Sequence, residues 1–334
     1  MKENIRSFCL TVLLLGLCVS QLQAKENDGE ALLEIPEETE NNEPTPKEFT
    51  QAIAAYQQKK YALALSLWEL LAKADYGPAL HNLGVAHEHG RGVRPDPAAA
   101  AKWYARAAEH DLPESFNNLG RLFARGHGVD QDFDKAFDFF EAAAEHEYAE
   151  AQFNLGVAYL QGRGVEIDEA EAAIWFEAAA EQGYTPAQYN VASLYQTGQG
   201  VEQDFAQAVS WFAEAAEAGD SLASYNLGLL YYRGQGVDQD PVTARQYFLT
   251  AANAGVLVAQ HQLAIMLAKG EGGAPDPESA LMWFHIAASL GNERAKKNRD
   301  LYMKILPPDI QGRASERARK FTPHSSSHTQ KKDN

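Results

Sequence analysis

The sequence predicts an all-α protein built as a solenoid of stacked helix-turn-helix repeats. Residues 79–294 restate one pattern six times at a spacing of 36 residues, without insertion or deletion. Two glycines and one aromatic residue recur in every copy. A fixed period of this size is typical of repeat proteins whose units stack and bury a continuous core. The recurring residues are Gly90, Gly126, Gly162, Gly198, Gly234 and Gly270, then Gly92, Gly128, Gly164, Gly200, Gly236 and Gly272, and Trp103, Phe139, Trp175, Trp211, Tyr247 and Trp283.

Each copy begins with a first helix, which the third copy illustrates. Ala151, Leu155, Ala158 and Tyr159 recur at steps of three and four residues, which places them on one helix face. Gly162 follows, and glycine readily adopts the left-handed conformation that ends a helix. The pattern therefore predicts a helix over about 151–161, with its apolar face toward the core.

A second helix follows an aspartate in all six copies. A carboxylate at that position accepts the free N–H groups of the first turn and complements the helix dipole. Small Ala172, Ala179 and Ala180 allow close approach of the next helix, and Trp175 belongs to the core. Glycine closes the later copies, but Asp111 and Glu147 replace it in the first two, where we expect looser turns. The capping aspartates are Asp96, Asp132, Asp168, Asp204, Asp240 and Asp276.

This pattern resembles the Sel1-like repeat, a relative of the tetratricopeptide repeat. The resemblance rests on the opening motif, the glycine loop and the aromatic block of the second helix; its residues include Ala79, Asn82, Leu83, Gly84, Tyr159, Gly162, Gly164 and Val165. It implies a right-handed superhelix whose first helices line the concave wall. Ala192 and Ala264 depart from the motif by replacing its opening glycine.

The rest of the chain is organised around this array. Residues 47–78 keep the register of a second helix but lack the glycine loop, and Pro307 interrupts the seventh copy. An array also needs terminal layers with a polar outer face. The predicted parts are a signal peptide (1–24), an acidic disordered linker (25–46), a tetratricopeptide-like hairpin (47–78), six Sel1-like repeats (79–294), C-terminal capping helices (295–321) and a disordered tail (322–334).

The first 24 residues have the features of an export signal. Lys2 and Arg6 precede an apolar run that is too short to span a membrane as a helix. We therefore expect an exported protein of the bacterial periplasm, with lipid anchoring through Cys18 as the alternative. The other cysteine, Cys9, also lies within this segment, so a chain cut after Ala24 contains no disulfide.

The net charge of the chain argues against some classes of partner. The formal net charge is −17, although residues 295–334 carry ten Lys or Arg against four Asp or Glu. An acidic body repels phosphate backbones, which argues against a nucleic-acid partner. No stretch after the signal is apolar enough to cross a membrane. The basic C-terminal segment is expected to dock on the acidic body or to contact a second partner.

A groove is predicted on the first helices, opposite the recurrent core positions. At 100° per residue this stripe lies two, six and nine residues after the opening alanine. It is polar in the first two copies and apolar in the later ones, which indicates a partner site; the alternative is packing between adjacent first helices. The recurrent asparagines beside it either hold a peptide or bond the neighbouring helix. The groove residues are Phe153, Val157, Leu160, Tyr189, Tyr225, Leu229, Tyr232, Ile265, Asn154, Asn190 and Asn226.

These observations favour a non-enzymatic scaffold or adaptor that binds a protein or peptide in cell-envelope assembly or regulation, without a cofactor. The main alternative is a peptidoglycan or muropeptide binder, in which the tyrosines stack on sugars. A β-lactam-interacting hydrolase is a weaker alternative, because the sequence lacks the S-x-x-K, S-D-N and K-T-G motifs. A zinc site at His81, His87 and His89 is also weak, because histidines two apart do not share a helix face.

Overall fold

The structure, a computed structural model, describes residues 32–33 and 46–323. The predicted signal peptide, most of the acidic linker and most of the tail lie outside these ranges. The described residues form sixteen α-helices and no β-strand. None of these helices has the length and hydrophobicity needed to cross a membrane.

The chain divides into two units, Met1–Tyr184 and Thr185–Asn334. Unit 1 contains α2 (Lys47–Gln57), α3 (Tyr61–Lys73), α4 (Gly77–His89), α5 (Pro97–Ala108), α6 (Pro113–Arg125), α7 (Phe133–Glu145), α8 (Ala149–Gln161) and α9 (Glu169–Glu181). Unit 2 contains α10 (Thr185–Thr197), α11 (Phe205–Glu217), α12 (Ser221–Arg233), α13 (Pro241–Asn253), α14 (Leu257–Lys269), α15 (Pro277–Ser289), α16 (Glu293–Ile305) and α17 (Pro308–Lys320).

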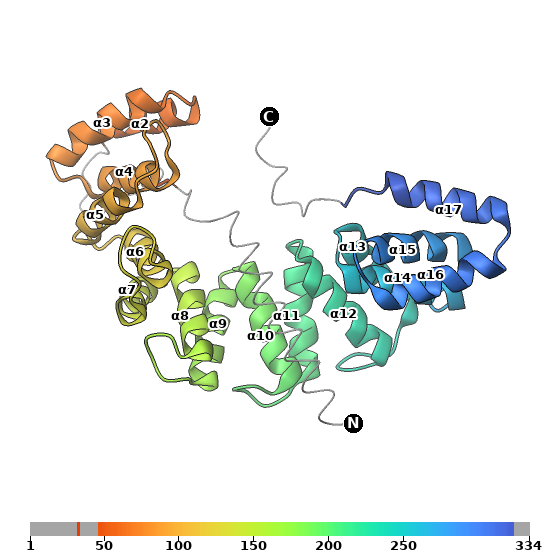
Figure 1. The fold of residues 1–334 in the computed structure, drawn as a ribbon. Helices are drawn as coiled ribbons and strands as arrows, with labels where there is room; N and C mark the ends of the chain where they lie inside the picture. The colour runs from red at the N-terminus through yellow and green to blue at the C-terminus, as the bar shows by residue number, and fades with distance from the viewer. Residues whose placement is uncertain (1–31, 34–45, 324–334) are drawn as a thin grey trace. The chain divides into compact units, whose positions relative to one another are not determined.

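Within each unit, helical hairpins follow one another in chain order (Figure 1). The predicted all-α solenoid class is confirmed. Each hairpin buries alanines and one large ring from its second helix; Phe176, Phe212 and Phe248 are fully buried examples. The opening glycine of the first helix makes room for that ring. A Cβ atom at Gly156 would lie 2.7 Å from the Phe176 ring, so the two helices pack this closely only because glycine has no side chain.

The predicted helix caps are confirmed. All six recurrent aspartates accept hydrogen bonds from the first turn of a second helix. In the third copy, Asp168 Oδ1 accepts from the backbone N–H groups of Ala170 and Glu171, at 2.9 and 3.1 Å. Gly162 ends the preceding helix with a φ of 63°. Caps therefore account for the aspartates, as the sequence predicts.

The turns after the second helices in the first two copies differ from expectation. Asp111 and Glu147 adopt left-handed φ values of 54° and 57°, so the turn that glycine makes in later copies is preserved. A β-carbon costs about 1 kcal/mol in this conformation. The expectation of looser turns was wrong, because the backbone keeps its hydrogen bonds and accepts this strain. The N–H of Glu147, for example, donates to the carbonyl of Ala144 at 2.9 Å.

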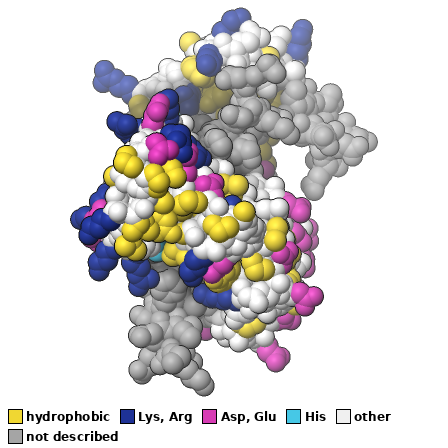
Figure 2. Space-filling view, turned by 90° about the vertical axis from the view of Figure 1, so that its right-hand side faces the viewer, with side chains coloured by type: hydrophobic (Ala, Val, Ile, Leu, Met, Phe, Trp, Pro, Cys, Tyr) yellow, Lys and Arg dark blue, Asp and Glu magenta, His cyan; other side chains and the backbone are white. Residues whose placement is uncertain are grey.

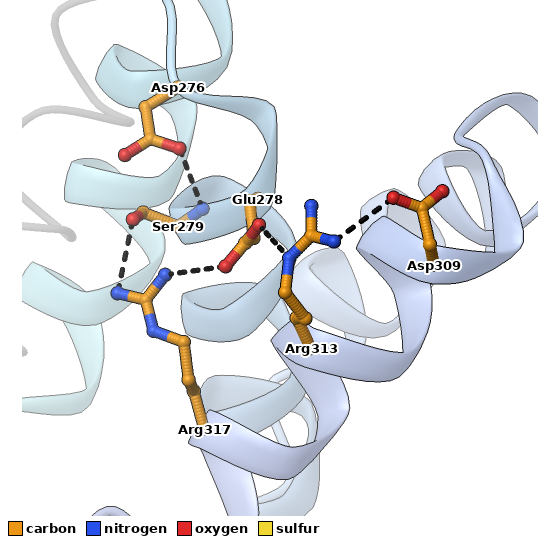
Figure 3. A network of polar contacts seen from close by, with 6 residues as sticks. All are labelled: Asp276, Glu278, Ser279, Asp309, Arg313 and Arg317. Atoms are coloured by element: carbon orange, nitrogen blue, oxygen red, sulfur yellow. Dashed lines mark hydrogen bonds and ion pairs between the residues drawn. The ribbon is translucent and has the colours of Figure 1, made fainter.

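The basic C-terminal helix docks on the body of unit 2. Arg313 Nε lies 2.7 Å from one Glu278 oxygen and Arg317 Nη1 lies 3.2 Å from the other, which joins α17 to α15 (Figure 3). The two guanidinium groups, Arg313 first, lower the pKa of Glu278. Ala314 is fully buried, and the Phe321 ring packs edge-on against Trp283 at 5.1 Å. One of the two expected roles of this segment is therefore observed.

Candidate functional site

The predicted stripe on the first helices is largely covered by packing. Phe153, Tyr189 and Tyr225 expose only 6, 3 and 8% of their surface. Their rings contact Phe176, Phe212 and Phe248 of their own hairpins, at 5.6, 5.6 and 5.7 Å between centroids. Rings buried in this way cannot stack on sugars. These three rings are therefore packed, but mainly against the second helix of their own hairpin and not only between adjacent first helices.

The recurrent asparagines show what covers the stripe. Asn154 Nδ2 of α8 donates to Asn117 Oδ1 of α6, at 2.8 Å, and Asn226 Nδ2 of α12 donates to the Tyr189 hydroxyl of α10, at 3.2 Å. In both pairs the asparagine of one copy bonds the stripe residue of the preceding copy. Burial raises the pKa of Tyr189 to about 12. Asn190, at the same repeat position, is also buried.

The other predicted groove residues are half-buried. They are Val157, Leu160, Leu229, Tyr232 and Ile265. The Tyr232 hydroxyl donates to Glu271 Oε2 at 2.9 Å. Their role in binding a partner stays a prediction.

A cavity of about 280 Å³ lies between α6, α7 and α8 of unit 1. Phe153, Asn154 and Val157 of the predicted set line it, together with Arg121 and Arg163. The Arg163 guanidinium lies over the Phe133 ring at 5.3 Å. The cavity therefore combines aromatic walls with positive charge, a lining that accepts an apolar side chain or one ending in an anion.

A buried polar network lies beside the cavity. The Tyr104 hydroxyl donates to Glu88 Oε2 at 2.8 Å, and the other Glu88 oxygen lies 3.7 Å from Arg121 Nη2. Arg121 Nη1 donates to Asn118 Oδ1 at 2.8 Å. The side chains of Glu88 and Arg121 are each only 7% exposed. Two members of the polar stripe of the first two copies, Glu88 and Arg121, thus form an internal charge pair.

Leu33 binds Asn82 of α4 through its backbone. The N–H of Leu33 donates to Asn82 Oδ1 at 2.9 Å, and Asn82 Nδ2 donates to the carbonyl of Leu33 at 3.1 Å. Leu32 packs against two apolar clusters of unit 1, one containing Leu83 and the other Val85. A single side-chain amide therefore satisfies both polar groups of one backbone residue.

Sequence reasoning missed this contact. Asn82 belongs to the recurrent asparagines, but the predicted groove lies on the later copies, where the stripe is apolar. The available signal was the pair Leu32–Leu33, two adjacent leucines in a segment that is otherwise rich in acidic residues. Pairing them with Asn82 requires a contact between residues 49 positions apart, which no local pattern indicates.

Two of the three histidines considered for zinc have other contacts. His81 is fully buried and its Nδ1 lies 2.8 Å from the Ser115 hydroxyl. The His87 ring stacks on Trp103 at 6.4 Å. Among residues 32–33 and 46–323, no three His, Cys, Asp or Glu side chains are grouped so that they could hold a metal ion.

Hairpins in fixed register, with capped second helices and an internally bonded inner face, define an α-solenoid scaffold. The chain belongs to the Sel1 repeat family, whose model matches residues 77–112, 113–148, 149–184, 185–220, 221–256 and 257–292. This scaffold commonly mediates protein–protein interaction. No curated protein matches the chain.

Solved structures include similar proteins. A Sel1 repeat protein from Oxalobacter formigenes is 27% identical, with a TM-score of 0.64, over 73% of this chain and 97% of that one. The protective antigen c5321 of uropathogenic Escherichia coli, which displays an SLR fold, is 23% identical over 86% and 79%, with a TM-score of 0.40. The immunity protein Pa5087 from Pseudomonas aeruginosa is 20% identical over 74% and 84%, with a TM-score of 0.39.

Proposed function

We propose that this protein is an exported, non-enzymatic adaptor that binds an extended peptide segment of a partner protein on the face of unit 1 that carries Asn82. The observation that carries the proposal is the pair of hydrogen bonds between Asn82 and the backbone of Leu33. A carboxamide offers both a donor and an acceptor, which matches the N–H and C=O of one extended residue. Such a contact accepts any bonded residue that has a backbone N–H, which excludes only proline.

Apolar side chains would supply the specificity. Main-chain hydrogen bonds give affinity in extended-peptide recognition, while pockets for individual side chains select the sequence. Leu32 shows that a leucine beside the bonded residue packs well against this surface. The cavity lined by Phe153 and Val157 offers a second apolar contact within the same unit.

Leu32 and Leu33 therefore act as a tethered ligand that a partner peptide must displace. The apolar run at the N-terminus supports export, and a periplasmic location would place the adaptor in the cell envelope, where recovery by osmotic shock tests it. The buried Tyr189 and Tyr225 give no support to sugar binding.

The test uses a fluorescein-labelled peptide with the sequence of residues 28–37 and measures fluorescence anisotropy. Leu33→Pro in the full chain removes the N–H that bonds Asn82 and opens the site. We expect this variant to bind the peptide about tenfold more tightly than the unchanged chain, because the tethered segment no longer competes. Adding Asn82→Ala is expected to abolish binding, since both hydrogen bonds are lost.

The matched control is Asn226→Ala in the Leu33→Pro background. Asn226 occupies the same repeat position, but its amide bonds Tyr189 within unit 2. Equal binding with and without Asn82→Ala, in chains that keep their helical circular dichroism, would exclude Asn82 as the peptide contact. Failure of the Leu33→Pro variant to bind the peptide would exclude this surface as a peptide site.

A further inference from the structure

Helix α16 is the first helix of a seventh copy. Ala295 takes the place of the opening alanine and is fully buried. Asn298 takes the place of the recurrent asparagine, and its Nδ2 lies 3.3 Å from Nε2 of His261, the stripe residue of the preceding copy. The register of the array therefore continues into α16, although the family match ends at residue 292.

The stripe of α16 differs from those of earlier copies in being uncovered. In the first copy the corresponding residues, His81 and Val85, are fully buried. In α16 they are Lys297, which is exposed, and Leu301, which is 53% exposed. Where a next first helix follows, as α8 follows α6, its asparagine bonds this stripe. No such helix follows α16 in the part of the chain that the structure describes.

Helix α17 does not fill this place. It packs on α15, where Arg313 and Arg317 bind the two oxygens of Glu278 (Figure 3). The ring of Phe321 extends the same contact to Trp283. Helix α17 therefore packs on α15, and the stripe of α16 stays open.

The open face has a distinct chemistry. We define it as Arg294, Lys297, Leu301, Lys304 and Ile305, which are spaced by three, four, three and one residues and so share one side of the helix. Ile305 is 63% exposed, and all three basic residues are exposed. Figure 2 looks at this end of unit 2 and shows hydrophobic side chains gathered there, bordered by Lys and Arg and also by some Asp and Glu.

We infer that the open face of α16 docks an acidic amphipathic α-helix of a partner protein, separately from the proposed peptide site on unit 1. The occupant is a helix because the same stripe in earlier copies is covered by a helix. Its charge follows from complementarity, since the open face carries three cations, and the carboxylates that border it, Glu293 and Asp300, are already paired with Lys296 and Arg299. Leu301 and Ile305 would bury against the apolar side of the partner helix.

The probe is a fluorescein-labelled helical peptide of about 20 residues, with leucine on one face and glutamate elsewhere. A second peptide carries lysine in place of glutamate. We expect the full chain to bind the glutamate peptide and not the lysine peptide. Leu301→Ser with Ile305→Ser should weaken binding about tenfold or more, and Lys297→Glu with Lys304→Glu should transfer preference to the lysine peptide.

The matched control is Leu63→Ser with Leu70→Ser, which removes two leucines of α3 that are 50 and 52% exposed, and it should leave binding unchanged. Equal binding of both peptides would overturn the inference, as would no loss with the α16 variants. Two other occupants of this face are tested separately. Light scattering tests for a second copy of the chain, and flotation with vesicles containing phosphatidylglycerol tests for a lipid surface. Dimerisation or lipid binding that depends on Leu301 and Ile305, without binding of the glutamate peptide, would also overturn it.

Discussion

Replacing Arg121 with leucine is expected to destabilise unit 1 by about 3 kcal/mol, since breaking a buried ion pair leaves the other charge uncompensated. Glu88 Oε1 lies 3.7 Å from Arg121, and both side chains are 7% exposed. Arg121 also donates to Asn118 and lies 4.0 Å from Glu150. Chemical unfolding followed by far-ultraviolet circular dichroism, with hydrogen exchange of α4 and α6, measures the loss.

Two further variants test whether loss of the buried ion pair causes this destabilisation. Arg125→Leu removes an exposed arginine one turn later in α6 and should change stability by no more than about 0.5 kcal/mol. Glu88→Gln in the Arg121→Leu background should recover much of the lost stability, because glutamine is uncharged and still accepts from Tyr104. Equal stability of the Arg121→Leu and Arg125→Leu chains would contradict the account.

Replacing Gly164 with alanine is expected to cost about 3 kcal/mol through two separate penalties. Gly164 has a φ of 75°, which disfavours any residue with a β-carbon. That carbon would also lie 2.2 Å from the carbonyl oxygen of Phe133, at the start of the second helix of the preceding copy. The second glycine of the loop thus allows direct backbone packing between consecutive repeats.

Gly183→Ala separates the two penalties. Gly183 has a φ of 81°, but no neighbouring atom lies within 4 Å of the added carbon. We expect a loss of only about 1 kcal/mol there, from conformation alone. Chemical unfolding of the full chain measures the loss of stability in both variants. Equal losses at the two positions would show that the close approach to Phe133 contributes nothing.

Features that depend on neighbouring residues could be predicted from the sequence. Asp168 precedes its helix directly and Gly162 follows one, so capping and termination need no knowledge of the tertiary structure. The fixed repeat length could also be used without the tertiary structure. One hairpin that recurs without insertions can stack in only a few ways. The fold class was predicted on these grounds.

Features that depend on how copies pack could not be derived in the same way. A helical wheel gives the direction in which Tyr189 points, but not that Asn226 of the next copy covers it. The pairing of Glu88 with Arg121 joins adjacent copies, whereas periodicity identifies these residues only as members of a polar stripe. The face of α16 is the opposite case, because its stripe is exposed. Helix α17 packs on α15 and does not cover it. The periodicity of one helix does not show which other helix packs against it.

The most direct test of peptide recognition is the hydrogen-exchange rate of the Leu33 backbone amide, measured by nuclear magnetic resonance in the full chain. If Asn82 holds this backbone, the amide exchanges at least about tenfold more slowly than an unstructured amide, and Asn82→Ala removes the protection. Exchange of Leu33 at the unstructured rate in the unaltered chain would contradict the proposed mode of binding.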